Sequence, residues 1–144
     1  MKNSVTPTAV PETTKPNTTP SEIRYAVKND LGWSPDMIGA EDAEGQGLTY
    51  AGQFGHPITH ITIEGVEKYR VFSKRGKWGE YHTGYDKENP AGNGSPILAI
   101  EIHDSNCIIG IHLNGGTWLP QARGTKGTGY AGSMSPIDAI WIDR

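Results

Sequence analysis

The feature that most constrains the fold of this chain is a short pattern that occurs three times at a nearly constant spacing. An Ala-Gly pair begins at residues 51, 91 and 131, and a Pro-Ile pair begins at residues 57, 96 and 136. A tryptophan stands at residues 33, 78 and 118, and a glycine follows each tryptophan six residues later. Because several anchors agree on one period, the sequence indicates an internal triplication. We place the repeats at about residues 22–64, 65–104 and 105–144.

Each predicted repeat contains short runs in which apolar residues occupy every second position. The last run of each repeat carries a pair of isoleucines: Ile61 and Ile63, Ile100 and Ile102, Ile140 and Ile142. Such alternation is typical of strands, and apolar residues at helical spacing are missing from the sequence. The chain is also rich in turn formers, with 19 glycines and 10 prolines. We therefore expect an all-β fold with a pseudo-threefold, β-prism-like body, and a β-trefoil is the alternative.

The repeated pattern has a structural explanation at each position. Ala-Gly supplies a tight turn at a place where a side chain would obstruct the chain. Proline can begin a strand, because its missing N–H group costs little there. The alternating isoleucines are expected to point inward, which leaves Thr62, Glu101 and Trp141 on the outside.

Residues 1–21 differ in composition from the rest of the chain. They are mostly Thr, Pro, Ser and Asn, and they offer almost nothing to bury in a core. We expect a disordered linker over residues 1–21 and one folded domain over residues 22–144. Since a linker joins two parts, the chain is predicted to be the C-terminal module of a larger protein.

Charge and cysteine content exclude several classes of protein. The formal net charge of −3 provides no basic surface for nucleic acid or for an anionic membrane. No apolar run is long enough to span a membrane, and no signal peptide opens the chain. The single cysteine, Cys107, excludes a disulfide within the chain, and its apolar neighbours predict a buried, inert thiol. One basic cluster is interpreted as a solvated face: Lys68, Arg70, Lys74, Arg75 and Lys77.

Patterns for catalysis or metal binding are weak. His56 and His60 lie four residues apart, but in a turn and a strand this spacing does not form a helical zinc site. Cys107 with His103 or His112 is a conceivable nucleophile and base, yet an apolar run does not activate a thiol. The acidic loops lack the spacing of a calcium-binding EF-hand. We therefore expect no catalytic residue, no metal and no cofactor in this chain, and no enzymatic activity.

Aromatic residues carry the stronger functional signal, because flat rings stack on the C–H faces of sugars. The three repeated tryptophans are either core residues or part of a binding surface. A tyrosine precedes Ala-Gly in the first and third repeats, and Pro90 replaces it in the second. Trp141 is an aromatic residue that the core does not require. The candidate ligand-binding residues are Trp118, Tyr130, Trp141, Trp33, Tyr50, Trp78 and Tyr85.

Several motifs in register resemble a known family. They are GGTWLP at residues 115–120, HTGYD at residues 82–86 and YAGSMSPIDAIWI at residues 130–142. They resemble the C-terminal cell-wall-recognition repeats of Gram-positive phage endolysins and related bacteriolytic enzymes, and more distantly the clostridial repeats built around a hydrophobic tryptophan. The second repeat departs from the family pattern, because Leu-Pro is missing after Trp78 and Pro90 replaces the tyrosine. A pocket built from these positions would be altered there.

The resemblance implies a module that binds peptidoglycan or a wall glycopolymer, while a separate lytic domain of the parent enzyme carries out catalysis. Repeated weak sites would gain avidity on a repetitive wall. Such a protein would stay in the host cytoplasm until lysis and then act at the Gram-positive cell wall. The first alternative is an assembly module that associates into a homo-oligomer, and the second is a general carbohydrate-binding lectin domain.

Overall fold

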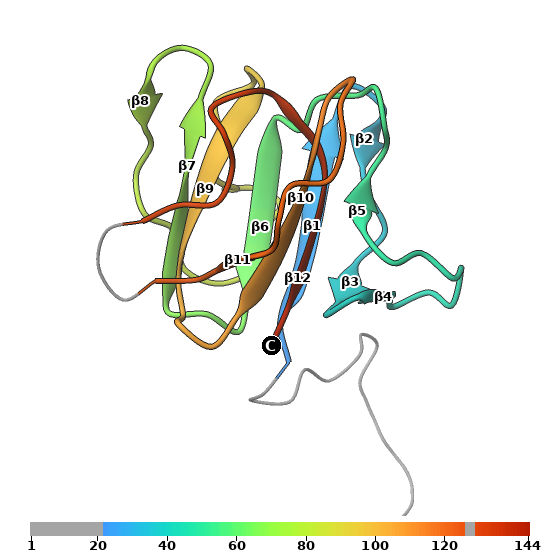
Figure 1. Cartoon of the computed structure of the whole chain (residues 1–144). Helices are drawn as coiled ribbons and strands as arrows, with labels where there is room; N and C mark the ends of the chain where they lie inside the picture. The colour runs from blue at the N-terminus through green and yellow to red at the C-terminus, as the bar shows by residue number, and fades with distance from the viewer. Residues whose placement is uncertain (1–21, 126–128) are drawn as a thin grey trace, which may run out of the picture.

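The computed structural model describes residues 22–125 and 129–144, which fold into strands joined by turns (Figure 1). No helix occurs among these residues, so the predicted all-β class is confirmed. Within the same ranges there is accordingly no helix that could cross a membrane. The linker predicted for residues 1–21 lies outside the described residues.

Three long antiparallel strand pairs form the framework of the fold. Each pair joins an early strand and the closing strand of one predicted repeat, and these long strands form the body of the molecule in Figure 1. The pairs are β1 (Arg24–Asn29) with β6 (His60–Glu64), β7 (Lys68–Ser73) with β9 (Ile97–His103), and β10 (Ile108–Leu113) with β12 (Ile137–Asp143).

Short strands extend the pairs into three antiparallel sheets. Their orders are β2-β1-β3-β4 with β6 also on β1, β8-β7-β9, and β11-β10-β12-β5. The short strands are β2 (Gly32–Trp33), β3 (Met37–Ile38), β4 (Glu41–Asp42), β5 (Ala51–Gly52), β8 (Lys77–Trp78) and β11 (Ala122–Arg123). The tryptophan of each repeat pairs with an outward-facing residue of the first long strand: Trp33 with Lys28, Trp78 with Phe72 and Trp118 with His112.

The core lies between the three strand pairs. Alternate residues of the long strands point into it, as the sequence alternation predicts. The isoleucine pairs of the closing strands are all inside, which confirms that prediction. The inward residues are Tyr25, Val27, Ile61, Ile63, Tyr69, Val71, Ile100, Ile102, Ile109, Ile111, Ile140 and Ile142. Each buried side chain of this size contributes about 1.5–3 kcal/mol of transfer free energy, so this cluster dominates the stability of the fold.

The Ala-Gly pairs connect the three strand pairs to one another. Each alanine pairs with the middle of the closing strand of the preceding repeat, and the first repeat docks in the same way on the last. The pairs are Ala51 with Ile140, Ala91 with Ile61, and Ala131 with Ile100. This recurrence agrees with an internal triplication, while the triplication and the choice of a β-prism over a β-trefoil stay predictions.

The glycine of each Ala-Gly pair is required by the neighbouring repeat. A Cβ atom on Gly92 would lie 2.1 Å from the carbonyl oxygen of Thr59, and the φ angle of Gly92 is +122°. The corresponding distances for Gly52 and Gly132 are 2.3 and 2.8 Å, to carbonyl oxygens of β12 and β9. The tight turn predicted from the sequence is therefore only part of the reason for glycine here. The atom that would clash with a side chain is a backbone carbonyl oxygen of another repeat.

The isoleucines that follow the repeated prolines also link the repeats. The N–H of Ile58 donates to the carbonyl of Ile137 at 2.7 Å, and the N–H of Ile97 donates to the carbonyl of Ile58 at 2.8 Å. The prolines of the second and third repeats directly precede β9 and β12, as expected for a strand-starting proline. Pro57, in contrast, lies three residues before β6.

Two buried tyrosine hydroxyls contact the glycine that stands six residues after the tryptophan in the first and second repeats. The Tyr25 hydroxyl accepts the N–H of Ile142 at 2.9 Å and donates to the carbonyl of Gly39 at 2.7 Å. Tyr69 makes the matching pair of hydrogen bonds in the second repeat. Burial raises the pKa of both tyrosines above the ordinary value. The hydroxyls thus tie the loop after Trp33 to β12 and the loop after Trp78 to β6.

The outward direction predicted for Thr62 and Glu101 is confirmed, whereas the solvated face predicted for the basic cluster is found only in part. Thr62 and Glu101 do face away from the core, but both are buried, because side chains and loops cover the outer faces of their strand pairs. The basic cluster is not uniformly solvated either. Arg70 lies 3.1 Å from a carboxylate oxygen of Glu101, and its guanidinium lies 4.9 Å from the centre of the Trp78 ring. The rest of that cluster is exposed at Lys74, Arg75 and Lys77.

Candidate functional site

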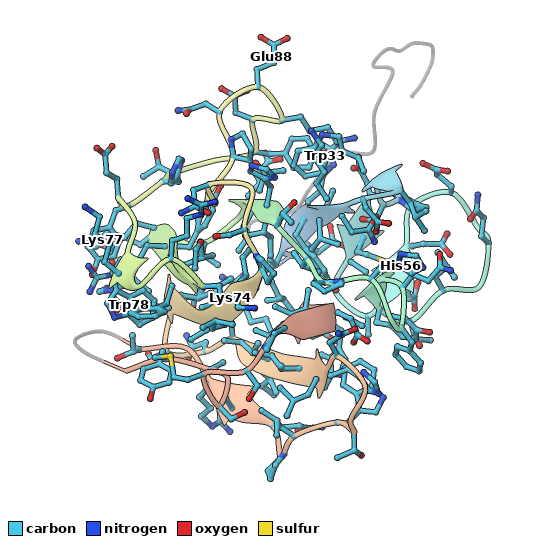
Figure 2. The ribbon with its side chains drawn as sticks, turned by 90° about the horizontal axis from the view of Figure 1, so that it is seen from above. Trp33, His56, Lys74, Lys77, Trp78 and Glu88 are labelled. Carbon is cyan, nitrogen blue, oxygen red and sulfur yellow. The ribbon has the colours of Figure 1, made fainter. Side chains whose placement is uncertain are left out.

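The three repeated tryptophans lie at the surface of the fold. Trp33 and Trp78 are half-buried, and Trp118 is 36% exposed. Figure 2 shows Trp33 and Trp78 at separate positions on the periphery of the molecule. The alternative that these tryptophans form the core is therefore wrong, and the isoleucines and tyrosines of the long strands take that place.

Each tryptophan lies next to an aromatic or cationic residue from another repeat. Tyr50 of the first repeat meets Trp118 of the third at 5.6 Å between ring centres. Tyr130 of the third repeat meets Trp78 of the second at 5.8 Å. The ammonium of Lys87 lies 5.5 Å from the ring centre of Trp33 and 5.9 Å from that of Tyr85. The seven candidate residues thus form groups that span two repeats, with Trp141 close to the first group.

The group around Trp118 is the largest aromatic cluster. The rings of Tyr50 and Phe54 stack at 5.2 Å, and those of Phe54 and His112 stack at 3.9 Å. Trp118 packs edge-on against all three rings, at 5.2–6.2 Å. Phe54 is 47% exposed, so the cluster lies open to ligands.

A buried carboxylate holds this cluster in place. Asp138 is fully buried, and one of its oxygens lies 2.7 Å from Nδ1 of His112. Its other oxygen accepts the N–H of Gly55 at 2.8 Å. Because Gly55 follows Phe54 in the chain, one carboxylate fixes both the imidazole and the turn that carries the phenyl ring. The ring positions are therefore set before any ligand arrives.

A groove of about 540 Å³ opens beside the cluster, between the first and third repeats. It brings together three of the predicted ligand-binding residues, Tyr50, Trp118 and Trp141. Polar groups of Thr49, Gln121 and Asp143 also line it.

Trp141 owes its position in this groove to Gly110 on the neighbouring strand. The two residues pair across β10 and β12, and a Cβ atom on Gly110 would lie 2.0 Å from the indole Nε1. The indole therefore lies directly over the glycine, half-buried, with part of its surface facing the groove. The prediction of an outward aromatic at this position is correct.

The corresponding positions on the other two strand pairs are filled by protein groups. In the first pair they are Ala26 and Thr62, and Thr62 accepts the N–H of Asp86 from the covering loop at 2.6 Å. In the second pair they are Arg70 and Glu101, which form an ion pair.

The Arg70–Glu101 pair belongs to a larger polar network. Tyr81 donates its hydroxyl proton to Glu101, and His103 contacts the same carboxylate. Burial by itself would raise the pKa of Glu101, but the bonds from Tyr81, His103 and Arg70 outweigh it and hold the pKa below its ordinary value. A carboxylate with its oxygens engaged in this way is a structural group that fills its face of the fold.

Tyr85 is also committed to the protein. Its hydroxyl donates to Asp36, and the guanidinium of Arg24 lies 4.1 Å from the centre of its ring. Burial, together with the hydrogen bond to Asp36, raises its pKa. Its hydroxyl and one ring face are therefore already engaged by the protein.

Residues considered for catalysis are placed unfavourably for it. Cys107 is fully buried, and burial raises the pKa of its thiol to about 11, as expected for an inert cysteine. His56 pairs with Asp30, and His60 lies 3.0 Å from the hydroxyl of Thr59. Across the described ranges, no group of three or more His, Cys, Asp or Glu side chains could hold a metal ion.

Phe54, His112 and Asp138 are members of the site that the sequence did not indicate as ligand-binding or supporting residues. Phe54 stands three residues after Ala51, where the other repeats have Gly94 and Met134. Aligning the three repeats could have identified Phe54, because the second repeat has a glycine at the same place in its turn. The roles of His112 and Asp138 depend on tertiary contacts alone.

No protein-family model, curated protein or solved structure matches this chain. The resemblance to lysin repeats therefore rests on the short motifs described above.

Proposed function

We propose that this chain is a non-catalytic module that binds a bacterial cell-wall glycan or glycopolymer in the groove between its first and third repeats. One observation carries the proposal: Tyr50, Trp118 and Trp141, which come from different parts of the sequence, line a single open groove. The family resemblance supports the same interpretation, because the third repeat, with its GGTWLP and YAGSMSPIDAIWI motifs, supplies both tryptophans.

The groove has the chemistry that sugar binding requires. Aromatic rings offer flat apolar surfaces to the C–H faces of a sugar, and hydroxyl or amide groups nearby can hydrogen-bond its substituents. Thr49 and Gln121 provide such groups without a full charge. A volume of about 540 Å³ lies within the range of small-molecule sites, which is roughly 300–1,000 Å³.

The lack of catalysis is part of the proposal, and two observations support it. The Cys107 thiol is buried, and its raised pKa keeps it protonated near neutral pH. The buried carboxylate of Glu101 is occupied by Arg70, Tyr81 and His103. We propose that a separate lytic domain supplies catalysis and that this module directs it to the Gram-positive wall.

The test is co-sedimentation of the chain with purified Gram-positive cell walls. Loss of one stacking ring should cost about 1–1.5 kcal/mol, so Trp118→Ala should weaken binding about tenfold. Trp78→Ala is the matched control, because it removes the equivalent tryptophan of the second repeat and should change binding less than about twofold. Walls stripped of attached polysaccharide separate peptidoglycan from the secondary polymers as the ligand.

A second variant tests the groove without removing an aromatic ring. Gly110→Ala places a methyl group where the Trp141 indole lies, so the indole must move and binding should weaken. Gly79→Ala is its control, because a Cβ atom there meets only the Val71 carbonyl oxygen, at 3.6 Å. Failure to sediment with any wall, or equal losses in the Trp118 and Trp78 variants, would contradict the proposal.

A further inference from the structure

A second groove, of about 330 Å³, adjoins the first one and shares Tyr50 with it. Its aromatic member is Trp33, and its apolar walls include Leu31, Pro35 and Leu48. Leu31 is 61% exposed and Leu48 is 36% exposed, so the groove has apolar surface that the fold leaves uncovered. Apart from Tyr50, the proposed function does not use any of these residues.

Tyr50 lies between the two grooves because of the way the first repeat docks on the third. It directly precedes β5, which pairs with β12, and this pairing brings its ring to 5.6 Å from Trp118. The rest of its surroundings come from its own repeat, where it lines the second groove together with Trp33. Tyr50 therefore lies in both grooves, with Trp118 and Trp141 beside it in the first and Trp33 in the second.

The wall between the grooves is held in a fixed shape. The side chain of Asp42 accepts the N–H groups of Glu44, Gln46 and Leu48, at 3.0, 2.7 and 2.6 Å. These bonds order the loop that leads from β4 to Tyr50. The second groove thus needs little rearrangement to receive a ligand.

The charge of the two grooves indicates which ligand they suit. No Lys, Arg, Asp or Glu stands among the described residues that line the second groove, whose polar groups include Asn29, Gln46 and Gln53. The ammonium of Lys87, which lies 5.5 Å from the ring centre of Trp33, is paired with a carboxylate oxygen of Asp36 at 3.9 Å. Asp143 is the single charged residue along the described lining of the first groove. A polyanion such as a phosphate-rich polymer would need lysine or arginine at these positions. Neutral sugars need uncharged hydrogen-bonding groups and apolar faces, which both grooves provide.

We propose that the two grooves form one continuous track for an internal stretch of a neutral, linear glycan chain, with Tyr50 as the shared contact. This inference rests on the proposed function and names its ligand class. Short fragments would fill the groove at Trp118 and Trp141, and longer fragments would extend past Tyr50 onto Trp33.

The experiment uses saccharide fragments released from purified walls and separated by size and, on an anion exchanger, into neutral and anionic pools. Calorimetry gives the affinity of each fraction for the full chain and for its variants. We expect neutral fragments to bind more tightly as their length increases. Trp33→Ala should weaken binding of long fragments about tenfold and leave short fragments unchanged, whereas Trp118→Ala and Tyr50→Ala should weaken both. Trp78→Ala, folded as judged by circular dichroism, is the matched control.

The outcomes separate this inference from the proposed function. If Trp118→Ala weakens binding to walls and fragments while Trp33→Ala changes nothing at any length, the single groove stands and the track is overturned. Binding confined to the anionic pool, or whole-wall binding with no binding of any released fragment, also overturns it. Wall binding that is unaffected by Trp118→Ala overturns the proposed function itself.

Discussion

At the residue scale, one glycine leaves room for an aromatic ring on one of the three outer faces of the fold. The equivalent positions of the three strand pairs carry Ala26, Arg70 and Gly110. Arg70 fills its face with an ion pair, and Ala26 lies under a covering loop. Gly110 leaves room for the Trp141 indole to lie flat beside an open groove. Gly110, the smallest of the three residues, therefore lies at the face where the binding surface is proposed.

The pKa of a single thiol gives a prediction at the same scale. Burial raises the pKa of Cys107 from 9.0 to about 11, so at pH 8 its thiolate fraction should be about 100-fold lower in the folded chain than in the unfolded chain. Alkylation by iodoacetamide at pH 8 should therefore be at least that much slower in buffer than in denaturant. Equal rates in the two solutions would show that the thiol is accessible and unperturbed.

The raised pKa of the Cys107 thiol also predicts how the stability of the fold changes with pH. The thiol pKa is raised in the folded state, so its stabilising contribution is complete below pH 9 and is lost as the pH rises toward 11. The raised pKa values of Tyr25 and Tyr69 act in the same direction at higher pH. The urea midpoint should fall over this range, and Cys107→Ala should reduce the part of the fall between pH 9 and 10.

At the scale of elements, the Ala-Gly pairs act as joints between repeats. The alanine pairs with a closing strand, and the glycine lets the backbone approach that strand closely. The sequence locates these pairs because they recur. It does not show that each pair contacts a different repeat, since the paired residues lie far apart in the chain, as Ala91 and Ile61 or Ala51 and Ile140 do.

A matched pair of glycine substitutions separates close contact from backbone strain. Gly92→Ala introduces a Cβ atom 2.1 Å from the Thr59 carbonyl oxygen at a φ of +122°. Gly94→Ala has a similar φ of +95° but no atom within 4 Å of the added Cβ. We expect a loss of about 1–2 kcal/mol for Gly94→Ala from strain alone, and about 1–3 kcal/mol more for Gly92→Ala. Urea denaturation measures both, and equal losses would show that the docking contact is not tight.

At the scale of the whole molecule, the first and third repeats close the fold. β5 pairs with β12, and the Tyr25 hydroxyl accepts the N–H of Ile142. All three strand pairs also contribute to one core. A repeat removed from this arrangement would expose inward residues on two neighbours, so the repeats are not independent units.

This closure predicts a single cooperative unfolding transition. Because the strand pairs share one core, far-ultraviolet circular dichroism and tryptophan fluorescence should give the same urea midpoint. Folding should be slow for a chain of this size, because contacts between the first and last strands form only after most of the chain is in place. Two separated transitions, or a fluorescence change that precedes the loss of strand signal, would show that one repeat unfolds alone.

The sequence by itself determined the all-β class, the long closing strands, the inward isoleucines and the set of aromatic candidates. These follow from alternation and recurrence, which are properties of neighbouring residues in the chain. Only the tertiary structure decided that Thr62 and Glu101 are buried, that Tyr85 is bound to Asp36, and that Tyr50 meets Trp118. The physical reason is that the docking of each repeat on the preceding one brings distant side chains together, and no local pattern encodes which outer face remains open.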